Sequence, residues 1–196
     1  MRSETELPPR RRHAIPEDLL PIVRERTWAR LLQASYLRGE FVLSSGRTST
    51  HYIDKYRFET RPDLLRDIAR LLACALPDAT TKLAGPALGG VPLATAVALE
   101  TGIPFVIVRP EPKSYATARL IEGQLEQGDR VVVIEDVVTT GAQAVRAARA
   151  VQDAGGRVLL VLAVVDRHEG GAAGVAAAGY PFQALYTLGD GLIQSK

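Results

Sequence analysis

The stretch that decides the fold is residues 131–143, VVVIEDVVTTGAQ, which runs from an apolar segment through two acids and two threonines to a glycine. Residues 131–134 show no alternation of apolar and polar side chains, so both faces of the strand they form should be covered. After Gly141, small apolar residues recur at helical spacing and polar or charged residues occupy the other side. A covered strand, a tight turn and an amphipathic helix predict one βα unit of a parallel sheet.

The rest of the chain repeats this unit at short spacing. We expect strands near residues 81–85, 105–108, 131–135, 158–165 and 182–187, with helices near 90–100, 141–154 and 171–178. A polar loop, residues 110–119, separates the second strand from the third. Strands that alternate with helices in this way are typical of an α/β fold. We therefore predict a doubly wound, mostly parallel sheet flanked by helices.

The first sixty or so residues have a different pattern. Residues 1–15 are polar and basic, and they are predicted to be a disordered tail. Apolar residues at helical spacing after Pro16 predict a helix that stops at Gly39, and residues 41–58 predict short strands around a Ser-Ser-Gly turn. A helix with Pro62 in its first turn should follow. The predicted division is a basic tail at 1–15, N-terminal helices and a small hood at 16–60, and a core at 61–196.

Composition is that of a soluble globular protein. The chain has 196 residues with a net charge of only +2, so its charge gives no reason to expect nucleic-acid binding. No segment is apolar enough to predict a membrane span, and the charged N-terminus lacks an apolar signal core, so we expect a cytoplasmic location. The single cysteine, Cys74, cannot form an internal disulfide. Because leucines surround it in a helical pattern, we expect its thiol to be buried.

The turn at the end of the 131–143 stretch has the chemistry of an anion site. Ligands of open α/β sheets bind at the carboxyl ends of the strands, where this turn lies. Backbone N–H groups at a helix start lack partners and carry partial positive charge, so they suit a phosphate. Gly141 lets the backbone approach closely, and the Thr139 and Thr140 hydroxyls can donate to phosphate oxygens. No G-x-x-x-x-G-K-[ST] sequence is present, which disfavours a nucleoside triphosphate loop.

Glu135 and Asp136 need a separate explanation, because two carboxylates repel a bare phosphate. They fit a phosphate that is tethered to a sugar, since carboxylates accept hydrogen bonds from vicinal ribose hydroxyls. Their charge also favours a ribosyl centre that becomes cationic. The plainer alternative is that the two acids only cap the turn. The apolar strand before them and the Thr-Thr-Gly sequence after them favour the sugar phosphate.

This stretch resembles the phosphoribosyl diphosphate motif of the type I phosphoribosyltransferases, and the similarity to orotate phosphoribosyltransferases extends over residues 37–187. Further segments carry the resemblance in the same order along the chain. Residues 39–47 with 52–54 resemble the hood, 85–94 the pyrophosphate-side loop, 109–115 the mobile catalytic loop, and 166–167 the end of the base-recognition strand. Together they imply the type I phosphoribosyltransferase fold.

The resemblance implies a Mg²⁺-dependent enzyme that transfers the 5-phosphoribosyl group of phosphoribosyl diphosphate (PRPP) to orotate, giving orotidine 5′-monophosphate and diphosphate in pyrimidine biosynthesis. It assigns catalysis to Lys113, Glu135 and Asp136, and orotate binding to Thr139 and Arg167. The implied PRPP-binding residues are Arg109, Lys113, Tyr115, Glu135, Asp136, Val137, Val138, Thr139, Thr140, Gly141, Ala142 and Gln143. Mg²⁺ would be held chiefly by the oxygens of the donor rather than by a metal site of the protein.

Two of these assignments have a physical rationale and also a plainer alternative. A leaving diphosphate needs cations and a lid that excludes water, which Arg109, Lys113 and Tyr115 can supply; the alternative is an ordinary solvated loop. A guanidinium such as Arg167 can bind the carbonyls or the carboxylate of a pyrimidine; the alternative is a surface ion pair with Asp166. In the family the catalytic loop reaches into the neighbouring subunit's site, which implies a homodimer with shared active sites.

Several positions depart from the family pattern. Pro110 stands where a second cation is common, and Ala116 and Ala118 stand in a stretch that is usually rich in glycine, so the lid should be stiffer and less positive. Residues 142–143, Ala-Gln, replace the usual Gly-Ser, which removes a small hydroxyl from the phosphate turn. Gly89 replaces a lysine that some members carry in the pyrophosphate-side loop.

Three functions are therefore open at this point. The chain is an orotate phosphoribosyltransferase, a phosphoribosyltransferase for another base, or a non-catalytic regulator that senses PRPP or a nucleotide on the same fold. The retained Lys113, Asp136, Thr139 and Arg167 favour the first. Pro110, Ala116 and Gln143 keep the other two open.

Overall fold

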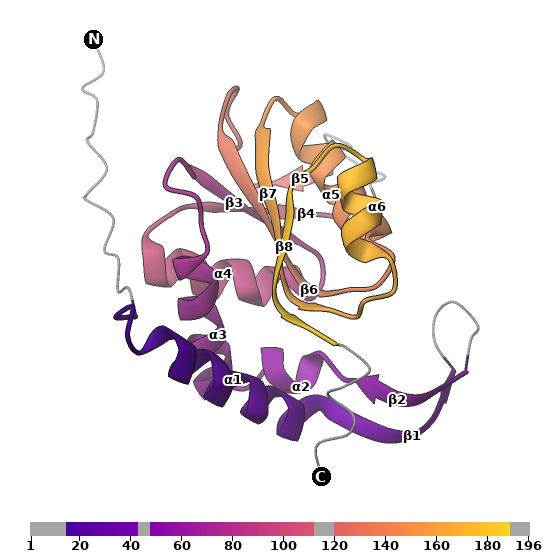
Figure 1. Cartoon of the computed structure of the whole chain (residues 1–196). Coiled ribbons are helices and arrows are strands. Elements are labelled where there is room, and N and C mark those ends of the chain that lie inside the picture. Colours follow the sequence, from indigo (N-terminus) through magenta and orange to yellow (C-terminus); the bar gives the residue numbers. More distant parts are fainter. Residues whose placement is uncertain (1–14, 43–47, 112–119, 189–196) are drawn as a thin grey trace.

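A six-stranded sheet with helices on both faces forms the body of the molecule (Figure 1). The computed structural model describes residues 15–42, 48–111 and 120–188. The helices are α1 (Leu20–Ser35), α2 (Tyr56–Glu59), α3 (Pro62–Cys74), α4 (Gly90–Thr101), α5 (Ala142–Asp153) and α6 (Gly171–Ala177). The strands are β1 (Tyr36–Val42), β2 (Thr48–Ile53), β3 (Lys82–Pro86), β4 (Phe105–Val108), β5 (Ile121–Glu122), β6 (Arg130–Val138), β7 (Arg157–Asp166) and β8 (Phe182–Thr187). The α/β alternation that the sequence predicted is confirmed.

The order of the strands creates a natural place for a ligand. The order is β5-β4-β3-β6-β7-β8, and all neighbouring pairs are parallel except β4 and β5, which are antiparallel. From β3 the chain passes to β4 on one side, whereas β6 is followed by β7 and β8 on the other. The direction of winding therefore reverses between β3 and β6, and open α/β sheets bind ligands in the crevice at such a reversal.

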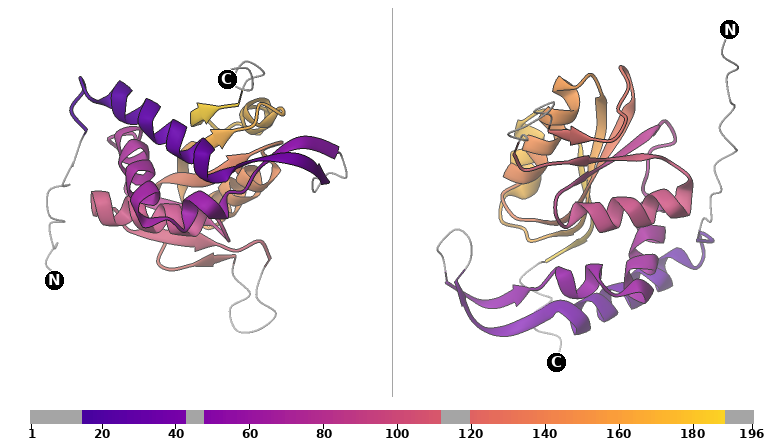
Figure 2. Two further views of the ribbon diagram at one scale, coloured as in Figure 1. Left: turned by 90° about the horizontal axis from the view of Figure 1, so that it is seen from below. Right: turned by 180° about the vertical axis from the view of Figure 1, so that it is seen from behind.

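Each face of the sheet has its own apolar core. On one face α3 and α4 pack around Leu72, Leu93 and Ile134, and α1 covers α3. On the other face α5 and α6 pack around residues that include Val133 and Ala147. Figure 2 shows the two groups of helices on opposite sides of the strands. The central strand β6 is buried along nearly its whole length, as its continuous apolar run predicted.

The N-terminal elements lie along one side of this body. The strands β1 and β2 form an antiparallel hairpin that projects beyond α2 (Figures 1 and 2). We call β1, β2, α2 and the two residues between β2 and α2 the hood. Helix α1 is bound to the last strand as well as to α3. The Trp28 ring stacks on the Tyr186 ring with centroids 4.6 Å apart, and the Tyr186 hydroxyl donates to the Arg24 carbonyl at 2.9 Å. The first helix and the last strand therefore hold each other in place.

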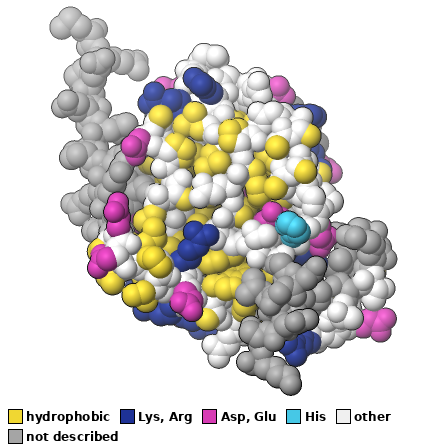
Figure 3. Space-filling model, in the orientation of Figure 1, with side chains coloured by type: hydrophobic (Ala, Val, Ile, Leu, Met, Phe, Trp, Pro, Cys, Tyr) yellow, Lys and Arg dark blue, Asp and Glu magenta, His cyan; other side chains and the backbone are white. Residues whose placement is uncertain are grey.

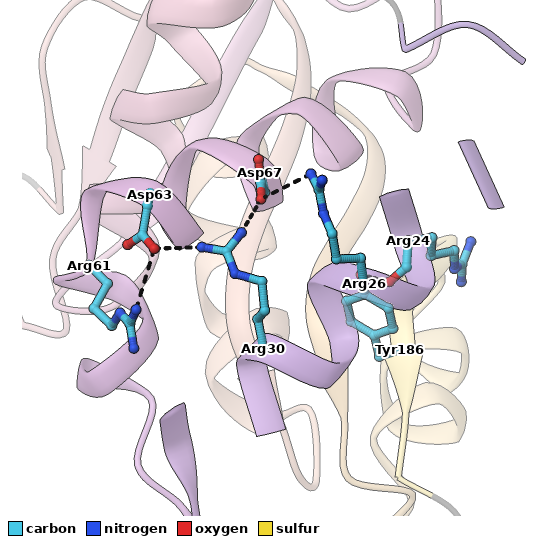
Figure 4. A network of polar contacts seen from close by, with 7 residues as sticks. All are labelled: Arg24, Arg26, Arg30, Arg61, Asp63, Asp67 and Tyr186. Carbon is cyan, nitrogen blue, oxygen red and sulfur yellow. Dashed lines mark hydrogen bonds and ion pairs between the residues drawn. The ribbon is translucent and has the colours of Figure 1, made fainter. Parts of the chain in front are cut away.

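A network of ion pairs joins α1 to α3 (Figure 4). The Arg30 guanidinium donates to Asp67 and, at 2.5 Å, to Asp63. Arg26 lies 3.7 Å from Asp67, and Arg61 donates to Asp63 at 3.3 Å. The contacts with Asp63 are exposed, and exposed pairs each contribute only about 0–1 kcal/mol. The contact of Arg30 with Asp67 is partly buried.

The first helix ends earlier than predicted. It stops at Ser35 rather than at Gly39, because the residues from Tyr36 onward belong to β1, where Tyr36 pairs with Ile53 of β2. Pairing with a strand farther along the chain overrides the helical periodicity, since a strand is stabilised chiefly by its cross-strand neighbours.

Three smaller predictions were also incomplete or wrong. Tyr56–Glu59, most of which fell in the stretch predicted as strands, form the short helix α2, and the antiparallel strand β5 was not predicted. Cys74 is exposed rather than buried. It is the last residue of α3 and lies on the opposite side of that helix from the buried Ile68 and Leu72, so its leucine neighbours in sequence do not cover it.

In the described part of the chain no helix is long and apolar enough to cross a membrane. On the face shown in Figure 3, basic and acidic side chains are scattered among apolar and neutral ones. The described side chains visible on that face therefore form no continuous basic stripe for a nucleic-acid backbone. The predicted basic tail, apart from Ile15, lies outside the described residues.

Candidate active site

The turn between β6 and α5 has a conformation that requires its glycine. Gly141 has a φ of 80° and directly precedes α5. A Cβ at this position would stand 2.9 Å from the Gly171 carbonyl oxygen and 2.9 Å from a methyl group of Val175, so a larger residue does not fit. The amides of Ala142 and Gln143, in the first turn of α5, have no intrahelical acceptors, and no side-chain cap accepts from the start of this helix. These amides are available to an anion, as the sequence predicted.

Helix α6 supports this turn from behind, which the sequence analysis missed. A Cβ on Gly171 would stand 2.6 Å from the Thr139 carbonyl oxygen, and a Cβ on Gly174 would stand 2.6 Å from the Thr140 carbonyl oxygen. The absence of side chains at both positions therefore lets the backbone of α6 touch the backbone of the turn. The signal was present as three glycines within residues 170–174, although spacing alone does not reveal which backbone they approach.

Glu135 and Asp136 lie inside β6 rather than at its end. The sequence predicted a strand that stops at Glu135, but β6 continues to Val138, because its last residues pair with β7 as far as Asp166. Each acid is only 2% exposed. The two carboxyl groups are therefore buried just before the turn, on the strand that borders the reversal of strand order.

Asp136 is contacted by groups from separate parts of the chain. Lys55 Nζ, from the residue that precedes α2, lies 2.7 Å from Asp136 Oδ2, and the Val137 N–H donates to Oδ1. The carboxylate also occupies the space beside the Gly89 backbone where a side chain would stand. Asp136 thus joins the hood, the pyrophosphate-side loop and β6. Sequence reasoning missed Lys55, because a single lysine whose partner is 81 residues away forms no local pattern.

Two further carboxyl groups surround this contact. Burial, reinforced by the charge of Asp136, raises the pKa of Glu135 to about 8. The same two causes raise the pKa of Glu59, in α2, to about 8. In the described part of the chain, the Oε1 atom of each has no hydrogen-bond partner, and the charge of Lys55 opposes both pKa shifts. Near neutral pH both groups hold a proton much of the time, which limits the negative charge buried around Asp136.

Arg109 lies at the base of the predicted catalytic loop. Its N–H donates to the Leu120 carbonyl at 2.8 Å, next to the pairing of β4 with β5, and its guanidinium lies 3.8 Å from Glu122. Arg109 and Gln143 line one cavity of about 250 Å³ together with residues 86–87 of the pyrophosphate-side loop. The cavity therefore brings together two predicted PRPP-binding residues, whereas the two acids of β6 do not line it.

Lys113 and Tyr115 lie outside the described residues, as do Ala116 and Ala118. Their roles stay predictions from the sequence. What the structure adds is the position of the loop's two ends, at Arg109 and Leu120, which are joined side by side by a backbone hydrogen bond.

Arg167 lies at the same edge of the sheet as the phosphate turn. Its N–H donates to the Val138 carbonyl at 2.9 Å, so it stands beside Thr139, the other predicted orotate residue. The alternative of an ion pair with Asp166 is not what forms. Arg167 pairs with Glu169 at 2.8 Å, and Asp166 accepts the His168 N–H at 2.9 Å.

Comparison with known proteins agrees with this geometry. A sequence profile of the phosphoribosyl transferase domain matches residues 57–176. The orotate phosphoribosyltransferase of Halobacterium salinarum is 53% identical over 152 residues, which is 78% of this chain and 86% of that protein. The crystal structure of the Mycobacterium tuberculosis H37Rv orotate phosphoribosyltransferase in complex with Fe(III) dicitrate superposes with a TM-score of 0.75 at 36% identity, over 85% of this chain and 97% of that chain.

A structure of the same M. tuberculosis enzyme in complex with 5-phospho-alpha-D-ribosyl 1-diphosphate gives a TM-score of 0.71 at 35% identity, over 85% of this chain and 96% of that chain. The matched residues 57–176 include the pyrophosphate-side loop, the base of the catalytic loop, β6 with its turn, and the end of β7. These are the segments on which the resemblance in the sequence rested, except the hood residues 39–47 and 52–54, which lie outside the matched range. Because identity and fold agree over most of its length, the chain belongs to the orotate phosphoribosyltransferase family.

Proposed function

We propose that the chain transfers the 5-phosphoribosyl group of PRPP to orotate and releases diphosphate. One observation carries the proposal: Glu135 and Asp136 stand directly before the Thr139–Gly141 turn, at the reversal of strand order, in a chain of this family. A phosphate site with carboxyl groups beside it suits a sugar phosphate better than a free phosphate, for the electrostatic reason given above.

In this proposal the 5′-phosphate binds at residues 139–143. The uncapped amides of Ala142 and Gln143 would donate to it, and the hydroxyls of Thr139 and Thr140 would add two more hydrogen bonds. The packing of α6 against this turn fixes the donors before the ligand arrives. A preorganised site of this kind loses little free energy on ordering when the phosphate binds.

Glu135 and Asp136 are proposed to accept hydrogen bonds from the two ribose hydroxyls. As the bond from C1 to diphosphate breaks, positive charge grows on the ribosyl ring. The buried Asp136 carboxylate, and Glu135 when it is ionised, stabilise that charge. The effect is large at this position because both side chains are withdrawn from water. A ring nitrogen of orotate then forms the new bond to C1.

The diphosphate is proposed to lie toward Arg109, Lys113 and Tyr115. Arg109 supports this because it shares a cavity with residues 86–87 and with Gln143 of the phosphate turn. Among the described residues no group of three or more metal-ligating side chains is placed to hold a metal ion. We propose that Mg²⁺ binds with the donor, because this hard cation prefers oxygen ligands such as those of the diphosphate. When bound with the donor, Mg²⁺ would add positive charge beside the leaving diphosphate.

Orotate is proposed to bind between Thr139 and Arg167. The backbone hydrogen bond from Arg167 to Val138 keeps Arg167 beside the phosphate turn, and a guanidinium can bind a carboxylate or two carbonyls in one plane. We further propose a cytoplasmic homodimer in which the loop of residues 110–119 completes the site of the neighbouring subunit.

The test is to incubate the purified protein with PRPP, Mg²⁺ and a panel of pyrimidine and purine bases, and to follow the release of diphosphate. The proposal expects turnover with orotate and no comparable rate with the other bases. Turnover of another base without orotate would assign the chain to a different acceptor. Binding of PRPP without turnover of any base would indicate a sensor rather than an enzyme.

A further inference from the structure

The contact between Lys55 and Asp136 has no role in the reaction as proposed so far. Asp136 is placed by several features: Val137 donates to Oδ1, Lys55 Nζ lies 2.7 Å from Oδ2, and the carboxylate rests against Gly89. Gly89 directly precedes α4, whose first turn has no side-chain cap. The partial positive charge at that helix start therefore adds to the charge of Lys55 in stabilising the carboxylate.

Lys55 is the member of this group that reaches solvent. Its side chain is 27% exposed, whereas Asp136 is 2% exposed and Glu59 3% exposed. The ammonium group also lies 5.5 Å from the centre of the Tyr56 ring, which is itself partly exposed. A ligand that approaches Asp136 from solvent on this side therefore meets Lys55 first.

We propose that Lys55, assisted by Glu59, is a positioning residue for the PRPP donor and acts through the Asp136 carboxylate. The inference rests on the proposed function and extends it to the hood. A carboxylate offers about four acceptor sites. Lys55 and Val137 use two of them, and the remaining acceptor positions are available to a ribose hydroxyl.

The physical need for Lys55 follows from the charges. Asp136, Glu59 and Glu135 bring three carboxyl groups into one buried region, and each of the two glutamates has Asp136 and Lys55 among its charged neighbours. A buried carboxylate that loses its ion-pair partner is strongly destabilised and takes up a proton or turns away. In either case it no longer presents the same acceptor to the sugar. Lys55 therefore couples the position of the hood to the affinity for the donor.

Steady-state kinetics with orotate and PRPP test the inference on the full-length protein. We expect Lys55→Met to raise the KM for PRPP about tenfold or more, and to change the KM for orotate far less. Lys55→Arg keeps the charge and should recover most of the affinity. Lys82→Met is a control, because Lys82 also pairs with an aspartate, Asp129 at 3.5 Å, and its side chain is even less exposed than that of Lys55 (11% against 27%). Lys82 lies at the end of β3 that is farther from Gly89. Lys82→Met should leave the KM for PRPP within about twofold of the wild type.

The pH dependence of PRPP binding provides a readout that loss of packing would not move. Glu135 faces Asp136, Lys55 and Glu59, and Glu59 faces Asp136, Lys55 and Asp54. If the ionised carboxylates bind the ribose, affinity rises as pH increases through about 8, the raised pKa of both glutamates. Lys55 lowers the pKa of Glu135 and Glu59 raises it. Lys55→Met should therefore move the pH range in which PRPP affinity rises to higher pH, and Glu59→Gln should move this range to lower pH.

The outcomes separate this inference from the proposed function. If the wild type turns over orotate while Lys55→Met keeps a normal KM for PRPP and an unchanged pH dependence of PRPP binding, the positioning role is wrong and the function stands. A large loss of turnover with an unchanged PRPP dissociation constant in calorimetry would also overturn it. If Lys55→Met does not fold, two other variants test the positioning role. Lys55→Arg should keep most of the affinity for PRPP, and Glu59→Gln should shift the pH dependence of PRPP binding to lower pH; the opposite results would overturn the role. A wild type that neither binds PRPP nor turns over a base would remove the function and the inference together.

Discussion

The Asp136 carboxylate occupies the space in which a Cβ on Gly89 would stand, so this side chain and the loop backbone are in direct contact. A methyl group at position 89 would also lie 2.7 Å from Glu59 Oε1, which leaves it no room. We predict that Gly89→Ala lowers kcat/KM for PRPP by at least about tenfold and lowers the free energy of unfolding by about 1–3 kcal/mol, because it overpacks a buried site. Kinetics and urea unfolding measure the two effects.

The control for Gly89 is at the other end of the same helix. Gly102 follows α4 with a φ of 74°, and a Cβ there would meet open space. Gly102→Ala should lower the free energy of unfolding by about 1 kcal/mol, only because alanine disfavours this positive φ. Its kcat/KM for PRPP should stay close to that of the wild type. Equal kinetic losses in both variants would mean that contact with Asp136 does not explain the effect at Gly89.

The contact between α6 and the phosphate turn gives a second prediction. Gly171→Ala should push the Thr139 carbonyl and weaken the binding of ribose 5-phosphate by about tenfold, measured by calorimetry. Gly170→Ala is the neighbouring control, since a Cβ there meets nothing within 4 Å although its φ of 92° strains any alanine. If Gly170→Ala weakened the binding of ribose 5-phosphate as much as Gly171→Ala does, backbone strain in the loop would explain the loss, rather than contact with the Thr139 carbonyl.

The fold was predictable because its signals are local. The apolar run at residues 131–134 indicates a buried strand, and the turn through Gly141 indicates the start of a helix. The parallel strands of the sheet, the helices that cover them and the phosphate turn were therefore predicted, whereas the antiparallel strand β5 was not. The position of the two acids was misjudged by a few residues, since pairing with β7 extends β6 to Val138. Whether the predicted site residues bind PRPP and orotate stays a prediction.

The contacts that sequence reasoning missed are those between distant segments. Lys55 and Glu59 are unremarkable in the sequence, and only the folded chain brings them to Asp136. The same holds for Gly171, whose need for a small residue arises from a methyl group of Val138 and the carbonyl of Thr139, at the end of β6 and in the turn after it. A pattern of neighbours along the chain carries no information about which backbone will lie opposite.

Glu135 should make the folded protein less stable as pH rises. Its pKa is about 8 in the folded protein against an ordinary value of 4.5, so between these values the folded state binds more protons than the unfolded state. The free energy of unfolding therefore falls as pH rises through this window. Glu135→Gln removes this titration, and the variant should gain stability relative to the wild type between about pH 5 and about pH 8. Urea unfolding at several pH values measures the difference; a difference independent of pH would contradict the assignment.

The stack of Trp28 on Tyr186 should contribute more to stability than the polar contacts around it. Trp28→Ala removes the ring that binds α1 to β8, and we expect it to lower the free energy of unfolding by about 2–4 kcal/mol. Tyr186→Phe keeps the stack and removes the hydrogen bond to the Arg24 carbonyl, so about 1 kcal/mol should be lost. The reverse order in denaturant unfolding would show that the hydroxyl rather than the ring holds α1.

The proposed assembly can be tested by mixing two inactive variants. If the loop of one subunit completes its neighbour's site, Lys113→Ala and Asp136→Asn damage different halves of each site. In a mixed dimer one site then combines the intact Asp136 of the first subunit with the intact Lys113 of the second, while the other site has neither. Random exchange makes half of the dimers mixed and restores one of their two sites, so activity should return to about a quarter of the wild-type value. Diphosphate release measures this recovery, and its absence after confirmed exchange would place the loop over the site of its own subunit.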